Sequence, residues 1–303
     1  MTVKERTESN IEEVKLCERI YGCIPEKPIH LTVDTVSEDR GFAAGTATLR
    51  EMRMIFDFEG ETESLPMISV IPNSVKKHPA IIYLSEGLSV PDRYLPAEEI
   101  AERGYAIFII SFDKVRESKI KRSSVLPTEP NCTNKKRNAP GELALLAWSA
   151  MRVTDFITKL DCIDKSKIAV AGHGLLGRGA LLTAAFDERV SFVIANDSLS
   201  LGLCEDISHA VNILPELFSN EYSQSDIDTD PHGILLLLCK DKHILVGTAE
   251  DDPRSNPNKE LEYLASLIKS GVPKERISYH SRNGSHYLSR ADWKVYLDYI
   301  DKI

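Results

Sequence analysis

Hydrophobic residues in the first part of the chain change from helical spacing to strand spacing. Residues 11–20 carry apolar side chains roughly along one side of a short helix, which we expect to pack on the main body. Residues 47–58 alternate between apolar and polar positions, which is typical of a strand with one buried face. Residues 66–72 predict a second strand, so we expect an antiparallel pair at the entry to a sheet. The buried face of the first strand should carry Met52, Met54, Phe56 and Phe58.

From about residue 79 the pattern becomes short apolar strands that alternate with amphipathic helices. This alternation is typical of βαβ crossover units and of a largely parallel sheet. Because such crossovers are right-handed, we expect helices on both faces of that sheet. The expected strands are 80–87, 105–110, 168–172, 190–197, 243–252 and 276–282. The expected helices are 97–104, 139–160, the segment after 174, 258–271 and 290–303.

Two segments do not fit this alternation. Residues 113–139 and residues 199–230 predict long connections, the second partly helical, and loops of this length are usually functional lids or mobile segments. A chain of 303 residues is within the range of one α/β domain. We therefore divide it into an N-terminal extension, residues 1–45, that packs on the body, and a single domain, residues 46–303.

Composition narrows the range of partners. The formal net charge is −9, which argues against a protein that binds the phosphate backbone of nucleic acids. No stretch has the run of apolar residues needed to cross a bilayer, and the polar N-terminal segment lacks the apolar region of a secretory signal. We therefore expect a cytoplasmic protein without nucleic-acid or membrane partners. The oligomeric state is left open by the sequence.

Six cysteines are scattered along the chain without a C-x-x-C pair. We expect free thiols, since neither a disulfide framework nor zinc-ligand spacing is present. A pair between Cys17 and Cys23, which are close in sequence, is the alternative in an oxidising compartment.

Residues 168–190 combine an apolar strand, a glycine-rich turn and a helix. In a serine hydrolase the nucleophile of G-x-S-x-G stands at such a strained strand-to-helix turn. Here Gly172 and Gly177 supply small residues around the turn, but its centre is Gly174, which has no hydroxyl. His173 should point away from the cleft in this geometry, so we expect a packed or hydrogen-bonded histidine.

The residues around this turn resemble the carbohydrate esterases of the α/β-hydrolase superfamily, which include glucuronoyl esterases and acetylxylan-esterase-like proteins. Those relatives carry G-[HC]-S-R-x-G-K-x-A-L followed by A-F-[DE]-x-R, where this chain has GHGLLGRGAL at 172–181 and AFDER at 185–189. The resemblance extends from about residue 79 to residue 303. It implies an α/β-hydrolase fold with a mostly parallel central sheet and helices on both faces, and it implies neither a cofactor nor a metal.

Two departures from the family pattern fall on positions that carry the chemistry. The family serine aligns with Gly174, and the following arginine, which helps to stabilise the oxyanion in the family, aligns with Leu175. Loss of either group should cost several orders of magnitude in rate, and loss of the nucleophile removes the acyl-enzyme route.

The other members of a catalytic triad have candidates in the expected chain order. Residues 282–293 resemble the family's stretch around the catalytic histidine, which implies that His286 is the general base. Asp197 matches the acid position of glucuronoyl esterases, whereas Asp252 matches the acidic loop used by most other α/β hydrolases. The general order of the fold favours Asp252. A turn cap at Asp197 and a solvated acidic loop at Asp252 are the structural alternatives.

Further residues are expected at the ligand pocket. Ser85 follows a predicted strand in the loop that usually forms the oxyanion hole, and Ser198 adjoins Asp197. Either serine is a candidate for a displaced nucleophile, although hydrogen-bonding loop residues are the simpler interpretation because neither lies on a strained turn. The expected pocket residues are Ser85, Glu86, Gly87, His173 and Ser198.

Three functions are compatible with these residues. The first is a pseudo-esterase that keeps the pocket and binds a saccharide or another small molecule. The second is an active carboxylic-ester hydrolase of the acetylxylan or glucuronoyl type, which uses a displaced serine or water activated by His286. The third is a non-enzymatic interaction protein whose partner surface is formed by the long connections.

Overall fold

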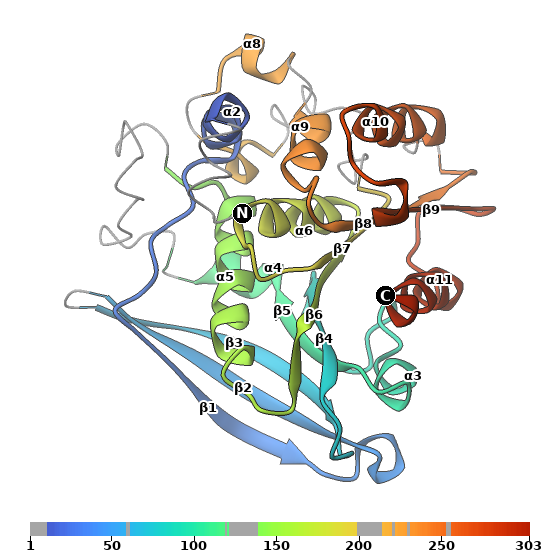
Figure 1. The fold of residues 1–303 in the computed structure, drawn as a ribbon. Coiled ribbons are helices and arrows are strands. Elements are labelled where there is room, and N and C mark those ends of the chain that lie inside the picture. The colour runs from blue at the N-terminus through green and yellow to red at the C-terminus, as the bar shows by residue number, and fades with distance from the viewer. Residues whose placement is uncertain are drawn as a thin grey trace.

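The computed structural model describes most of the chain as a sheet between two layers of helices (Figure 1). The described residues are 11–58, 61–118, 120, 139–198, 214–219, 222–228, 231–252 and 256–303. Within these ranges, nine strands form one sheet in the order β1-β2-β3-β5-β4-β6-β7-β8-β9. The strands are β1 His30–Asp39, β2 Ala47–Phe58, β3 Glu61–Pro72, β4 His78–Ser85, β5 Ala106–Ser111, β6 Ile163–His173, β7 Phe192–Asn196, β8 His243–Ala249 and β9 Ile277–Arg282.

The sheet consists of a parallel block and an antiparallel edge. The six strands from β5 to β9 in the sheet order pair in parallel, whereas β1, β2 and β3 pair antiparallel with their neighbours. All residues of β5 and β7 are buried, as expected of parallel strands that helices cover on both faces. The predicted mostly parallel sheet and the antiparallel entry pair are confirmed.

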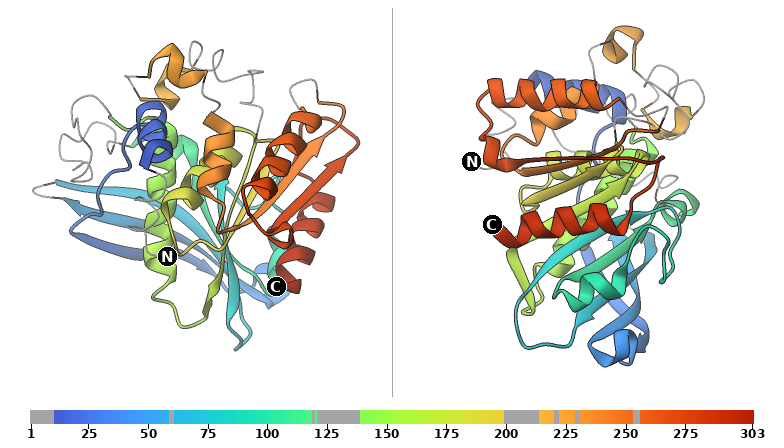
Figure 2. Two further views of the ribbon diagram at one scale, coloured as in Figure 1. Left: turned by 45° about the horizontal axis from the view of Figure 1, so that its top comes forward. Right: turned by 90° about the vertical axis from the view of Figure 1, so that its right-hand side faces the viewer.

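Helices cover both faces of the parallel block. Figure 2 shows strands β8 and β9 between helix α10 on one face and α11 on the other. Two separate apolar cores correspond to these two faces. The first face carries α2 Ile11–Tyr21, α4 Phe112–Glu117, α5 Glu142–Ile157, α6 Leu175–Phe186, α9 Pro231–Leu238 and α10 Pro257–Lys269. The second face carries α3 Ala97–Glu102 and α11 Arg290–Lys302. The predicted helices on both faces are therefore confirmed.

Several elements differ from the expectation. Strand β1 was missed because it lies at the edge of the sheet with mostly exposed, polar positions, so it lacks an apolar run. It adds residues 30–39 of the expected extension to the central sheet, and the division at residue 46 stays a prediction. Helix α4 lies at the start of the connection expected at 113–139, and α9 follows the one expected at 199–230. Residues 121–138 and 199–213 lie outside the described residues.

Among the described residues, Cys23 departs from the expectation of free thiols. Cys23 is disulfide-bonded, whereas Cys17, Cys162 and Cys239 carry thiols that form no disulfide. The expectation is therefore wrong for Cys23, and the alternative Cys17–Cys23 pair is wrong as well. Sequence spacing failed here because a disulfide depends on which residues the fold brings together. Cys17 is buried in α2, and burial raises the pKa of its thiol far above the usual range. Among the described residues, no helix has the length and apolar character needed to cross a membrane.

A cluster of charged side chains holds the segment between α6 and β7. This segment leads into β7, and Asp197 directly follows that strand. Asp155 of α5 lies 2.8 Å from Arg152 Nε and 2.5 Å from Arg189 Nη1. Burial alone would raise the pKa of Asp155, but the guanidinium groups of Arg152 and Arg189 lower it overall. Because Arg152 is buried, removal of Asp155 would take away its ion-pair partner and leave Asp187 as the carboxylate that still acts on its charge.

We expect Asp155→Asn to lower the free energy of unfolding by about 3 kcal/mol near neutral pH. The folded pKa of Asp155 is depressed, so its contribution is complete above the unfolded carboxyl pKa of about 3.9 and is lost as the pH falls through the folded value. Urea denaturation at neutral and acidic pH measures both effects, with the exposed Asp161→Asn as the matched control. An equal deficit at both pH values would contradict this electrostatic account.

Candidate functional site

The candidate site is formed where the parallel strands end. His173 is the last residue of β6, Asp197 directly follows β7, Asp252 follows β8 and His286 lies in the loop after β9. The carboxyl ends of parallel strands meet at one edge of a sheet, which is where ligands bind in open α/β folds. The structure thus gathers four predicted residues that are far apart in sequence.

Gly174 forms a sharp turn between β6 and α6. Its backbone has φ 57° and ψ −125°, in a region that side-chain-bearing residues rarely adopt, and its N–H donates to the carbonyl of Asn196 at 2.8 Å. The neighbouring glycines are required by packing. A Cβ at Gly172 would lie 2.2 Å from the carbonyl oxygen of Leu176, and one at Gly177 would lie 2.9 Å from the Cβ of Ser198. The backbone of this turn has the strained strand-to-helix form of a nucleophile elbow.

His286 faces the position where the elbow would carry a side chain. A Cβ built on Gly174 would lie 3.0 Å from Nε2 of His286 and 3.3 Å from its Cε1. The imidazole edge that would receive a proton from a serine hydroxyl is therefore directed at a bare Cα.

Asp252 is the hydrogen-bond partner of His286. Its Oδ2 lies 2.8 Å from Nδ1 of His286, whereas Oδ2 of Asp197 lies 3.8 Å from the same nitrogen. Of the two acids left open by the sequence, the geometry therefore gives the orienting contact to Asp252. A carboxylate in this place holds the Nδ1–H tautomer, which leaves Nε2 as the basic nitrogen.

Asp197 is held by the backbone of the neighbouring strand. Its Oδ1 accepts a hydrogen bond from the N–H of Ala249 at 2.9 Å, and its own N–H donates to the carbonyl of Gly247 at 2.7 Å. Burial raises the pKa of Asp197 to about 7, with a further rise from the nearby Asp252 and opposition from the Ala249 N–H and from Arg282. Its carboxyl therefore gains a proton around neutral pH.

Asn196 connects the two histidine–acid groups and was missed in the sequence. The hydroxyl of Tyr296 donates to its Oδ1 at 2.7 Å, which directs the amide nitrogen away from Tyr296. That nitrogen lies 3.0 Å from Nδ1 of His173 and donates to Oδ2 of Asp197 at 3.1 Å and to the carbonyl of Tyr287 at 3.3 Å. Nδ1 of His173 is therefore a hydrogen-bond acceptor.

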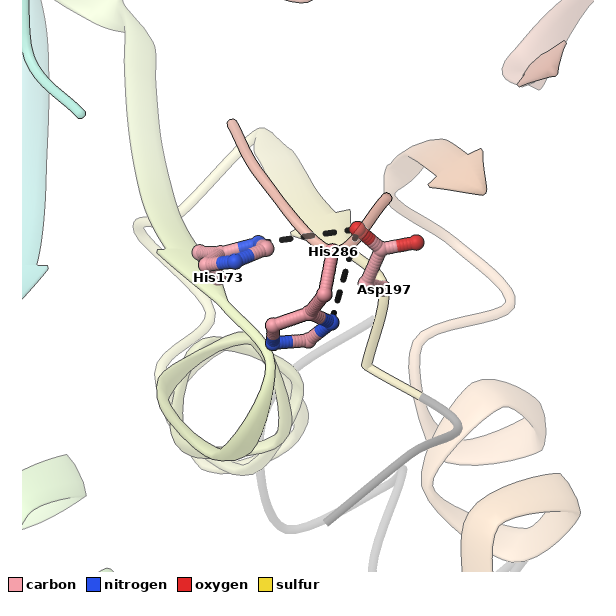
Figure 3. Close-up of side chains that lie close together, drawn as sticks. All are labelled: His173, Asp197 and His286. Carbon is pink, nitrogen blue, oxygen red and sulfur yellow. Dashed lines mark ion pairs between the residues drawn. The ribbon is translucent and has the colours of Figure 1, made fainter. Parts of the chain in front are cut away.

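His173 is a hydrogen-bonded histidine, as expected, but it contacts the site directly. Its ring centroid lies 4.2 Å from that of His286, so it does not point away from this group. Burial, followed by the neighbouring His286 and Arg282, lowers the pKa of His173 to about 3, which keeps the imidazole neutral. Figure 3 shows both histidine rings directed at Asp197, with dashed lines for the two 3.8 Å ion-pair contacts.

The remaining predicted residues surround this group less closely. Ser85 is buried and its hydroxyl donates to Asp92 at 3.2 Å, while the backbone carbonyl of Glu86 accepts from the hydroxyl of Ser111. Within the described part of the chain, no hydrogen bond joins Ser85, Glu86 or Gly87 to His286. The hydroxyl of Ser198 is buried and has no hydrogen-bond partner among the described residues.

Leu175 begins helix α6 directly after the turn. Its half-buried side chain packs against the apolar core. An apolar side chain carries no positive charge, so this position offers no charged group that could stabilise an oxyanion.

Comparisons of the sequence and of the fold with known proteins match carbohydrate esterases. The family model described as "Glucuronyl esterase, fungi" matches residues 58–209. Carbohydrate esterase MZ0003, from an unknown prokaryotic organism, is 25% identical over 191 residues, which cover 53% of this chain. The chain spans about 44% of the length of that relative.

Solved structures of glucuronoyl esterases share the fold. The enzyme from Solibacter usitatus superposes with a TM-score of 0.79 at 20% identity, covering 97% of this chain and 92% of that one. A mutant of the Sporotrichum thermophile glucuronoyl esterase, in complex with methyl 4-O-methyl-β-D-glucopyranuronate, gives a TM-score of 0.62 at 18% identity, covering 98% of this chain and 80% of that one. These likenesses show the α/β-hydrolase fold.

The contact between residue 174 and His286 can be measured as a coupling free energy. Gly174→Ala should lower the free energy of unfolding by about 1–2 kcal/mol, because the positive φ is unfavourable and the added Cβ meets Nε2 at 3.0 Å. His286→Ala in the same protein should recover about 0.5 kcal/mol or more of this loss. Gly104→Ala is the matched control, since φ is +97° there and an added Cβ meets nothing within 4 Å. Strict additivity at residues 174 and 286 would show that the two do not touch.

Proposed function

Because the chain belongs to the glucuronyl esterase family of carbohydrate esterases, we propose that it is a pseudo-esterase that binds a saccharide ligand of the uronate-ester class. One observation carries this proposal. The elbow is present in its strained geometry and His286 faces it, yet residue 174 has no side chain. Without a hydroxyl or thiol on the elbow, no acyl-enzyme can form there.

The residue after the elbow supports the same conclusion. The family resemblance puts an oxyanion-stabilising arginine where this chain has Leu175. Removal of one oxyanion donor typically costs about 100- to 1,000-fold in rate, which adds to the loss of the nucleophile. Two adjacent replacements that both oppose ester cleavage are consistent with a protein that has lost this reaction.

The rest of the site supports binding. The His286–Asp252 hydrogen bond is intact, and Asp197 and His173 are buried beside it with defined partners. The Sporotrichum thermophile relative was solved with methyl 4-O-methyl-β-D-glucopyranuronate. This uronate ester is therefore the first ligand to test on the present protein. A small molecule or saccharide, and neither nucleic acid nor a membrane, is the partner class that we propose.

A second candidate function has support from the tautomer of His286. Asp252 holds the proton on Nδ1, so Nε2 can accept a proton from a water molecule as the water oxygen attacks an ester carbonyl. The proton then passes to the leaving alcohol. This route needs no side chain at position 174, and it would give a slow hydrolase in place of a pseudo-esterase.

The double variant Gly174→Ser/Leu175→Arg tests the pseudo-esterase proposal. We expect the parent to bind methyl 4-O-methyl-β-D-glucopyranuronate without turnover, and the double variant to hydrolyse it at a rate at least about 100-fold above the uncatalysed background. Calorimetry measures binding, and methanol release measures turnover. Leu175→Arg alone is the matched control and should stay inactive.

The two candidate functions predict different results for His286→Ala. Turnover by the parent that His286→Ala abolishes would overturn the pseudo-esterase proposal and support the water route. A fluorophosphonate probe should leave the parent unlabelled and label the double variant at position 174. Labelling of a different serine in the parent would instead establish a displaced nucleophile.

A further inference from the structure

We propose that His173, Asp197 and His286 form a binding site for a divalent transition-metal ion, with Zn²⁺ as the best match. The three side chains come from the carboxyl ends of β6, β7 and β9 and converge at the base of the site. This proposal goes beyond uronate-ester binding and does not depend on it.

The first argument is the distance between donor atoms. One nitrogen or oxygen from each residue lies within 4.8 Å of the other two. Oδ2 of Asp197 is 3.8 Å from Nδ1 of His173 and 3.8 Å from Nδ1 of His286. A tetrahedral zinc site has metal–ligand bonds of about 2.0–2.2 Å, which puts its ligand atoms about 3.3 Å apart. The two carboxylate–imidazole distances exceed this value by about half an ångström, and the widest pair in the cluster, within 4.8 Å, by at most about 1.5 Å, so side-chain rotation would have to close the site.

The second argument is the direction of the lone pairs. The amide nitrogen of Asn196 lies 3.0 Å from Nδ1 of His173 and is a donor, so a lone pair of this imidazole points into the cluster. A metal ion would replace the amide hydrogen at this nitrogen. The amide nitrogen would retain the carbonyl of Tyr287, which it reaches at 3.3 Å.

The third argument is a candidate for the fourth ligand. Oδ2 of Asp252 lies 2.8 Å from Nδ1 of His286, at the edge of the same cluster. Two imidazole nitrogens with one or two carboxylate oxygens are a ligand set that suits zinc, whereas magnesium and calcium prefer oxygen alone. One of the proposed ligands is also held by a group outside the ligand set, since the N–H of Ala249 donates a hydrogen bond to the second oxygen of Asp197.

Metal binding would change the role of His286. An ion on Nδ1 would displace the proton through which Nδ1 donates a hydrogen bond to Asp252, and the ring would then be fixed through the metal. Nδ1 of His286 can therefore either donate a hydrogen bond to Asp252 or bind the ion, but not both.

The test is metal binding by the full-length chain after treatment with a chelator. Titration calorimetry with zinc chloride should give one ion per chain, and cobalt(II) should give the visible absorption of a four-coordinate site. His173→Asn and Asp197→Asn should each weaken zinc binding by about 100-fold or more. His243→Asn should leave the affinity unchanged, since His243 begins β8 at the opposite end of the sheet.

Two results would overturn the site. One is the absence of zinc binding at micromolar concentration, and the other is an affinity that neither ligand variant changes. If a ligand variant fails to fold by circular dichroism, the cobalt spectrum of the parent decides alone, because a six-coordinate spectrum excludes the proposed tetrahedral site. The double variant Gly174→Ser/Leu175→Arg provides a separation from the proposed function, since its ester cleavage tests the pseudo-esterase proposal while it replaces none of the metal ligands.

Discussion

The pairing of His173 with Asn196 across β6 and β7 is the constraint on which the site depends. This register brings the Asn196 carbonyl to the N–H of Gly174, which fixes the elbow, and brings the Asn196 amide to Nδ1 of His173. A shift of one residue would turn these side chains to opposite faces of the sheet. The buried apolar strands on both sides keep the register in place, so packing and site geometry have the same physical origin.

The sequence predicted the parts of the fold that depend on apolar burial. The strands of the parallel block are recognisable because helices cover both their faces, which requires continuous apolar residues. Strand β1 had no such signal, since the edge of a sheet tolerates polar side chains. The disulfide of Cys23 could not be predicted because it depends on three-dimensional proximity. Disulfides are rare in reducing compartments, so the disulfide of Cys23 counts against the expected cytoplasmic location. That location stays a prediction.

The site was predictable where residues have family positions, as for His286 and the two aspartates. The choice between Asp197 and Asp252 required distances, since both lie after neighbouring strands and differ by about an ångström in their approach to one nitrogen. Asn196 and Tyr296 gave no signal, because an amide and a phenol acquire their roles only from the atoms that they meet. Similarly, the convergence of two histidines with Asp197 cannot be seen in residues so widely separated along the chain.

Gly247 allows a side chain from a helix on one face of the sheet to reach a residue of the site. A Cβ at this position of β8 would lie 2.0 Å from the hydroxyl of Tyr296. Only because residue 247 has no side chain can that hydroxyl approach and bind Asn196. Tyr296 belongs to α11, on the face opposite to α6. The last helix of the described chain thereby forms a hydrogen bond to the amide that also contacts His173 and Asp197. The position of α11 on the far face is therefore tied to the site by this hydrogen bond, and also by Asp292 of the same helix, which binds Arg282.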